Sequence, residues 1–116
     1  MNKGDEEKMG EFMARVRRHL VKVYGLEPEQ VEQMLNISLK SLAESLAQAQ
    51  SALAENDLQA LSRAAHKAKG MLLNAGLEQE AELALTIESR ARDEKEDNYA
   101  ELLNRLTQSI PSLIEQ

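Results

Sequence analysis

The sequence contains no cysteine, which excludes disulfide bonds and metal sites built on thiolates. Only three aromatic residues occur in 116, too few for a surface on which nucleic-acid bases could stack. The net charge of −6 also argues against nucleic acid, because phosphate backbones bind to basic faces. No run of about 18 apolar residues occurs, so no membrane span is expected. We therefore expect a cytoplasmic protein with neither a nucleic-acid nor a membrane partner.

The residues that favour β-strands are also scarce. Val, Ile and Thr together number 10, whereas Leu and Ala number 33, a balance that favours helices. The first ten residues are charged and lack the apolar core of a secretory signal. The starting Met favours a free-standing protein. A chain of this length suits one domain with a modest core.

Five stretches place apolar residues at the three- and four-residue spacing of an amphipathic helix. They cover residues 5–24, 28–55, 58–76, 77–92 and 99–113. The short connections predict that consecutive helices run antiparallel. The expected fold is all-α: an up-down-up-down four-helix bundle over about 28–114, with an additional N-terminal helix, and residues 1–116 forming a single domain.

Residues with special backbone preferences mark the expected helix boundaries. Gly25 is placed to end the first helix, and Pro28 to begin the second. Asp57 is a good N-cap for the third helix. The polar run 93–98 predicts a loop before the fifth helix, and Pro111 should end or kink that helix.

The second stretch approaches a heptad repeat, which is typical of bundle packing or of a coiled coil. Its apolar positions are Val31, Leu35, Leu39, Leu42, Leu46, Ala49 and Leu53. The repeat is short for an independent coiled coil, so we favour packing within the bundle. Self-association through this helix is the weaker alternative, and a monomer is expected.

The third stretch combines a continuous apolar stripe with an unusual polar face. The stripe consists of Leu58, Leu61, Ala65, Ala68, Leu72 and Ala75. His66 lies off this stripe and should face solvent, with Arg63, Gly70 and Leu73 on the same side. Lys69 lies between that side and the stripe. Glycine inside a helix costs roughly 1 kcal/mol relative to alanine, so Gly70 should have a compensating use, such as clearing a surface for another backbone.

The run Ala65-His66-Lys67-Ala68-Lys69-Gly70, followed by Asn74-Ala75-Gly76-Leu77, resembles the histidine phosphotransfer (HPt) domain of multistep phosphorelays. The family signature is a His, two residues, Lys-Gly, and then small or apolar residues and a glycine turn. The resemblance extends over about 26–92. Met71 departs from it, because the family often has Ser or Ala there.

The resemblance implies that His66 is the phosphorylated residue and that its Nε2 is the attacking atom. Imidazole suits this role because its reference pKa of about 6.5 leaves a free lone pair near neutral pH. Lys69 is the first candidate to stabilise the transferred phosphoryl group. Lys67 and Arg63 are weaker candidates, because both could be ordinary solvated surface.

Three further residues complete the expected site. Gly70 and Leu73, with the two weaker cations Arg63 and Lys67, would form a surface on which a partner docks. Glu88, in the next helix, is a candidate acceptor for the other ring nitrogen of His66. Such a hydrogen bond would fix the tautomer that leaves Nε2 free. Glu88 could equally be an ordinary exposed carboxylate.

The expected partners are response-regulator receiver domains and a hybrid sensor histidine kinase. The chain has no Gly-rich nucleotide loop, so we expect a phosphocarrier rather than an enzyme with its own ATP site. We expect no cofactor, and any magnesium would belong to the receiver. The competing hypothesis is a helical adaptor or inhibitor that binds a kinase or receiver without being phosphorylated.

The first helix carries a cluster of basic residues. The cluster consists of Arg15, Arg17, Arg18, His19 and Lys22. It could attract an acidic partner, but a solvated face that balances an acidic chain is the interpretation we favour. His19 is interpreted as structural or incidental. Neither histidine has the Glu or His spacing of a helical metal site, so no metal is expected.

Overall fold

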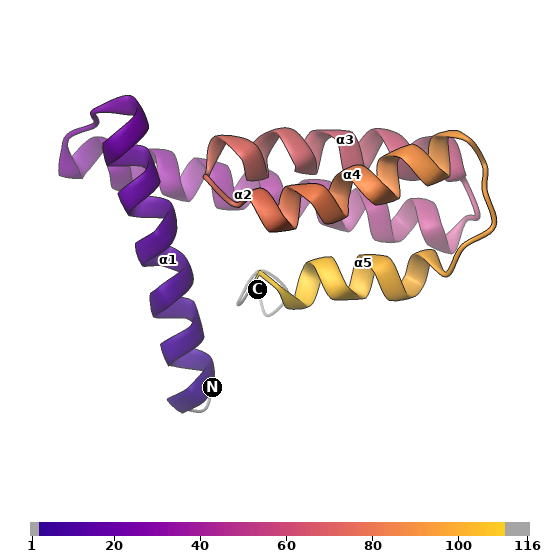
Figure 1. Cartoon of the computed structure of the whole chain (residues 1–116), viewed down its shortest axis with the longest axis horizontal. Helices are drawn as coiled ribbons and strands as arrows, with labels where there is room; N and C mark the ends of the chain where they lie inside the picture. The colour runs from indigo at the N-terminus through magenta and orange to yellow at the C-terminus, as the bar shows by residue number, and fades with distance from the viewer. Residues whose placement is uncertain (1–2, 111–116) are drawn as a thin grey trace.

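The computed structural model of the chain describes residues 3–110, which form five α-helices and no strand (Figure 1). The helices are α1 (Lys3–Tyr24), α2 (Pro28–Ala54), α3 (Leu58–Asn74), α4 (Glu78–Arg92) and α5 (Tyr99–Gln108). Helices α2 to α5 run alternately up and down as an antiparallel bundle, and α1 crosses one end of it (Figure 1). The predicted fold class is therefore confirmed.

The helix boundaries follow the local chemistry of the chain. Gly25 has a φ of +62° directly after α1, a conformation that glycine adopts without strain. Pro28 is the first residue of α2. The Asp57 side chain accepts a hydrogen bond from the Ala60 backbone N–H and so caps α3. Asn98 caps α5 in the same way.

Several helix boundaries differ from the sequence prediction. Helix α1 begins two residues earlier, at Lys3, α2 ends one residue earlier, at Ala54, and α3 ends two residues earlier, at Asn74. Helix α4 begins at Glu78, because Leu77 is its N-cap. Helix α5 ends at Gln108 rather than near residue 113. The expected effect of Pro111, and the place of Leu113 in this helix, lie outside the described residues.

The predicted apolar stripes form the core of the bundle. All the stripe residues of α3 are buried except Leu58, which is half-buried. The stripe of α4 is fully buried and consists of Leu77, Ala81, Ala84, Ile87 and Ala91. In α2, Leu39 and Leu53 pack at the margin of the core and the other heptad positions are buried. No helix among residues 3–110 is long and apolar enough to cross a membrane.

Helix α1 contributes Phe12, Val16 and Leu20 to the core, as its spacing predicts. Val23, which has the same spacing, is 57% exposed. The reason is that the last turn of α1 projects past the end of α3 and α4 before the chain returns as α2 (Figure 1). The apolar spacing of α1 therefore continues beyond the part of the helix that packs against the bundle.

Polar contacts attach α1 to the bundle. Arg17 donates two hydrogen bonds, of 2.8 and 2.9 Å, to the Glu32 carboxylate of α2. Nη1 of Arg15 lies 3.5 Å from Oε2 of the buried Glu80 of α4. The ring of His19 packs so closely on Gly76 that a Cβ at Gly76 would lie 2.4 Å from it. These contacts give part of the basic cluster a structural use, in agreement with the structural interpretation of His19.

Candidate functional site

His66 lies midway along α3, and its side chain is 66% exposed. Its neighbours Ala65 and Ala68 are buried on the core side of the helix. The position of His66 off the apolar stripe therefore produces a histidine that solvent and other proteins can reach. Small buried side chains on both α3 and α4 allow the two helices to pack closely beside it.

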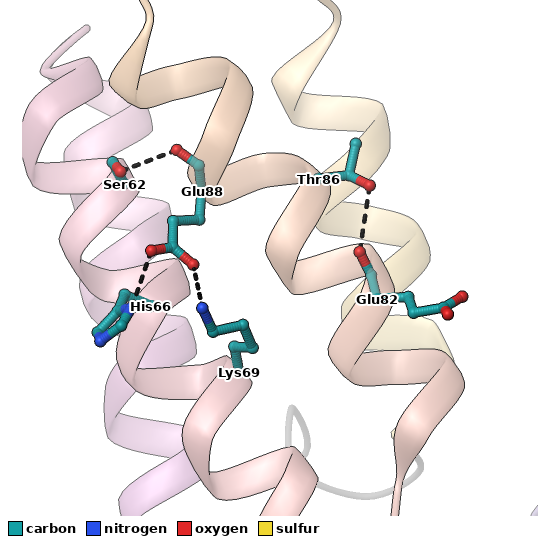
Figure 2. Close-up of polar contacts among 6 residues, drawn as sticks. All are labelled: Ser62, His66, Lys69, Glu82, Thr86 and Glu88. Carbon is teal, nitrogen blue, oxygen red and sulfur yellow. Dashed lines mark hydrogen bonds and ion pairs between the residues drawn. The ribbon is translucent and has the colours of Figure 1, made fainter.

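Glu88 of α4 extends its carboxylate towards α3 and contacts two side chains there (Figure 2). Its Oε2 lies 2.8 Å from Nδ1 of His66. Its Oε1 lies 2.8 Å from the ammonium Nζ of Lys69. The side chain of Glu88 is only 12% exposed. Glu88 is therefore a largely buried carboxylate between α3 and α4, not the ordinary exposed carboxylate that the sequence also allows.

The charge state of Glu88 determines the direction of its hydrogen bond with His66. Partial burial acts to raise the pKa of Glu88, but the contacts to Lys69 and His66 outweigh it and hold the pKa below the ordinary value of 4.5. The group is therefore a carboxylate at neutral pH, and a carboxylate can only accept. Nδ1 of His66 must then donate its hydrogen. In the neutral ring this leaves the lone pair on Nε2.

The remaining predicted residues lie along α3 near His66. Arg63 and Lys67 are exposed, and Leu73 is 50% exposed. Gly70 is exposed, and a Cβ added to it would meet no atom within 4 Å. No contact within residues 3–110 therefore requires a glycine at this position. Lys69 differs from the other two cations, because its side chain is only 22% exposed and pairs with Glu88.

The arrangement brings together an exposed imidazole, an ammonium group and a carboxylate on the facing sides of α3 and α4. Ser62 also belongs to this assembly, because its hydroxyl donates a hydrogen bond of 2.8 Å to the backbone oxygen of Glu88. Ser62 is not among the site residues predicted from the sequence. The one feature of the sequence that could have indicated it is that Ser62 is a polar residue among the buried positions of α3, one turn before His66.

Comparison with known protein families matches residues 33–116 to the Hpt domain. The match includes His66, Lys69 and Glu88 and leaves out α1. No curated protein and no solved structure gives a significant match to the chain. Hpt domains take part in histidine phosphotransfer within phosphorelays, as phosphocarriers without an ATP site of their own. Because the match covers well over half of the residues, the chain belongs to the Hpt domain family.

Proposed function

We propose that this protein is a phosphohistidine carrier that accepts a phosphoryl group from a receiver-domain aspartate and passes it to another receiver. A hybrid sensor histidine kinase would supply the first receiver, and a response regulator the second. The proposal places the relay in the cytoplasm. The observation that carries it is the exposed His66 whose Nδ1 is held by Glu88 at 2.8 Å.

The chemical step follows from that hydrogen bond. The lone pair of Nε2 attacks the phosphorus of the aspartyl phosphate, an N–P bond forms, and the P–O bond to the aspartate breaks. The aspartate leaves as a carboxylate, and Nδ1 of His66 keeps its proton. The phosphorylated ring carries a positive charge, which the adjacent Glu88 carboxylate stabilises. The reverse step transfers the group to the next receiver.

Lys69 would supply positive charge to the phosphoryl oxygens, on which charge accumulates during transfer. Its ammonium carries three donors, so one can stay on Glu88 while another contacts a phosphoryl oxygen. The ion pair with Glu88 holds the lysine on the imidazole side of α3 before the partner arrives (Figure 2). We therefore assign Lys69 a role in both the transition state and the product.

The exposed residues on either side of His66 would form the docking surface. Gly70 leaves space for a receiver backbone, Leu73 offers an apolar contact, and Arg63 and Lys67 offer positive charge. Successive partners must use the same surface and leave it again. We therefore expect a small interface, below roughly 1,200 Å² of total buried area.

The test is a phosphotransfer assay with labelled, phosphorylated receiver domains. Native protein should acquire an acid-labile, base-stable label, and His66→Gln should acquire none while keeping the helical circular dichroism of the native protein. His19→Gln is the matched control, because it removes the only other histidine and should still be labelled. Label that persists in His66→Gln would contradict the proposal.

The same variants distinguish a carrier from an adaptor. An adaptor needs the surface but not the imidazole, so His66→Gln would bind receivers and signal like the native protein. If native protein binds receivers but takes up no label from a broad set of them, the adaptor explains the surface better.

A further inference from the structure

Ser62 makes an unusual hydrogen bond for a serine inside a helix. It lies on α3 one turn before His66, its residue is only 7% exposed, and its hydroxyl donates to the backbone oxygen of Glu88 on α4. Helical Ser and Thr hydroxyls often bond instead to a carbonyl of their own helix. Thr86 and Thr107 do so here, each to a carbonyl three or four residues earlier, and Ser109, the C-cap of α5, donates to the Leu106 carbonyl of that helix. Ser62 connects two helices.

The acceptor of the Ser62 hydrogen bond is Glu88, the residue whose carboxylate contacts both His66 and Lys69. Ser62, His66 and Lys69 stand at positions i, i+4 and i+7 of α3, so they share one side of that helix. They contact the backbone oxygen, Oε2 and Oε1 of Glu88, respectively, each at 2.8 Å (Figure 2). Both the backbone and the carboxylate of Glu88 thus contact side chains of α3.

We propose that Ser62 is a positioning residue for phosphotransfer: its hydroxyl fixes the backbone of Glu88 so that the carboxylate reaches Nδ1 of His66. Ser62 touches no reacting atom and acts through Glu88. The inference rests on the proposed function for its effect on transfer, but its effect on the imidazole can be measured without any partner. A hydrogen bond weakens steeply as its distance and angle depart from the optimum, so a small shift of α4 would loosen the contact at Nδ1.

A purely structural role would have a different signature. Ser62 could simply satisfy its own buried hydroxyl and add to the packing of α3 on α4. Removing it would then lower the stability of the protein without changing the tautomer of His66. The Glu88 carbonyl would remain paired within α4, because it is also an acceptor of the helix. Ser62→Ala is therefore expected to fold.

The experiment compares Ser62→Ala with Thr86→Ala in the full chain. Thr86 is the matched control, because its hydroxyl also donates to the backbone oxygen of a glutamate of α4, Glu82, but within that helix and away from His66 (Figure 2). Long-range ¹H–¹⁵N NMR spectra give the tautomer of His66 at neutral pH. The assay with phosphorylated receiver gives the transfer rate over a range of receiver concentrations.

Ser62→Ala should lower the fraction of His66 with its hydrogen on Nδ1. It should also slow transfer at saturating receiver by about two- to tenfold, the effect of one neutral hydrogen bond, and leave the half-saturating concentration unchanged. Thr86→Ala should change neither quantity. In a Glu88→Gln background, Ser62→Ala should cause less additional slowing than it does alone, because both changes act on the same contact.

Either an unchanged tautomer or an unchanged transfer rate in Ser62→Ala would overturn the inference, as would its full effect on top of Glu88→Gln. If Ser62→Ala does not fold, Ser62→Cys repeats the test with a group of similar size that is a weaker donor. If receivers fail to label even the native protein, the carrier function fails, and the tautomer still decides the role of Ser62.

Discussion

At the scale of single residues, the acid–base behaviour of Glu88 gives a test of the site that needs no partner. Folding lowers the pKa of Glu88 below 4.5, so the folded protein binds this proton less strongly than the unfolded chain does. The contribution of Glu88 to stability is therefore fully present above about pH 4.5 and is lost as the pH falls through the lowered pKa.

The comparison is between native protein and Glu88→Gln, whose amide does not titrate. The difference in their free energies of unfolding should be fully present above about pH 4.5 and should shrink as the pH falls below that value, through the lowered pKa of Glu88. Urea denaturation at a series of pH values measures it. Glu82→Gln, which removes an exposed carboxylate of the same helix, controls for the loss of one negative charge. A difference that grows as the pH falls would show that Glu88 is not stabilised as an anion.

Gly70 gives a second test at the scale of single residues, because its replacement should change stability and function in opposite directions. Alanine at this position should raise the free energy of unfolding by about 1 kcal/mol, the difference in helix propensity, because its Cβ meets no other atom. If a receiver backbone occupies that space, Gly70→Ala should raise the receiver concentration needed for half-maximal transfer. Urea denaturation and the transfer assay measure the two effects. A more stable variant with unchanged receiver dependence would remove Gly70 from the docking surface.

At the scale of the helices, the turn between α3 and α4 is a point at which α1 packs on the bundle. Gly76 has a φ of +78° and lies against the ring of His19. Gly25 has a similar φ of +62°, but a Cβ there would meet nothing within 4 Å. Both glycines therefore have a positive φ, but only at Gly76 would an added side chain collide with a neighbouring residue.

Gly25→Ala should cost about 1–2 kcal/mol of stability, the strain of a side chain in the left-handed region. Gly76→Ala should cost more, because its Cβ also collides with His19. Adding His19→Ala to Gly76→Ala should recover part of the stability that Gly76→Ala loses beyond the loss in Gly25→Ala. Equilibrium denaturation of all three variants would measure these losses. Equal losses in the two single variants would contradict the packing of α1 against this turn.

The helices and several of their ends could be predicted because they depend on local information. Apolar spacing, a capping Asp57 and a left-handed Gly25 act over a few residues. The exposure of His66 followed from the same spacing. The Ser62–Glu88 hydrogen bond could not be predicted, because it depends on the register between α3 and α4. The spacing of apolar residues within either helix does not determine that register. The exposure of Val23 depended in the same way on where α1 crosses the bundle.

At the scale of the whole molecule, the exposed apolar side chains bear on the oligomeric state. Val21, Val23 and Tyr24 on α1, and Met34 and Ile37 on α2, are each more than two-fifths exposed. They lie on the helices that meet beyond one end of α3 and α4 (Figure 1). The heptad-like positions of α2 that could have formed a coiled coil are instead used inside the bundle. Self-association would therefore have to use the exposed side chains.

We expect a monomer at micromolar concentration, because each copy carries a net charge of −6 and so repels another. Sedimentation velocity should show one species of monomer mass at both low and moderate ionic strength. A dimer that appears only when salt screens the charge would mean that repulsion alone keeps the copies apart. A dimer already present at low salt, and dissociated by Ile37→Lys, would contradict the monomer and assign self-association to the exposed side of α2.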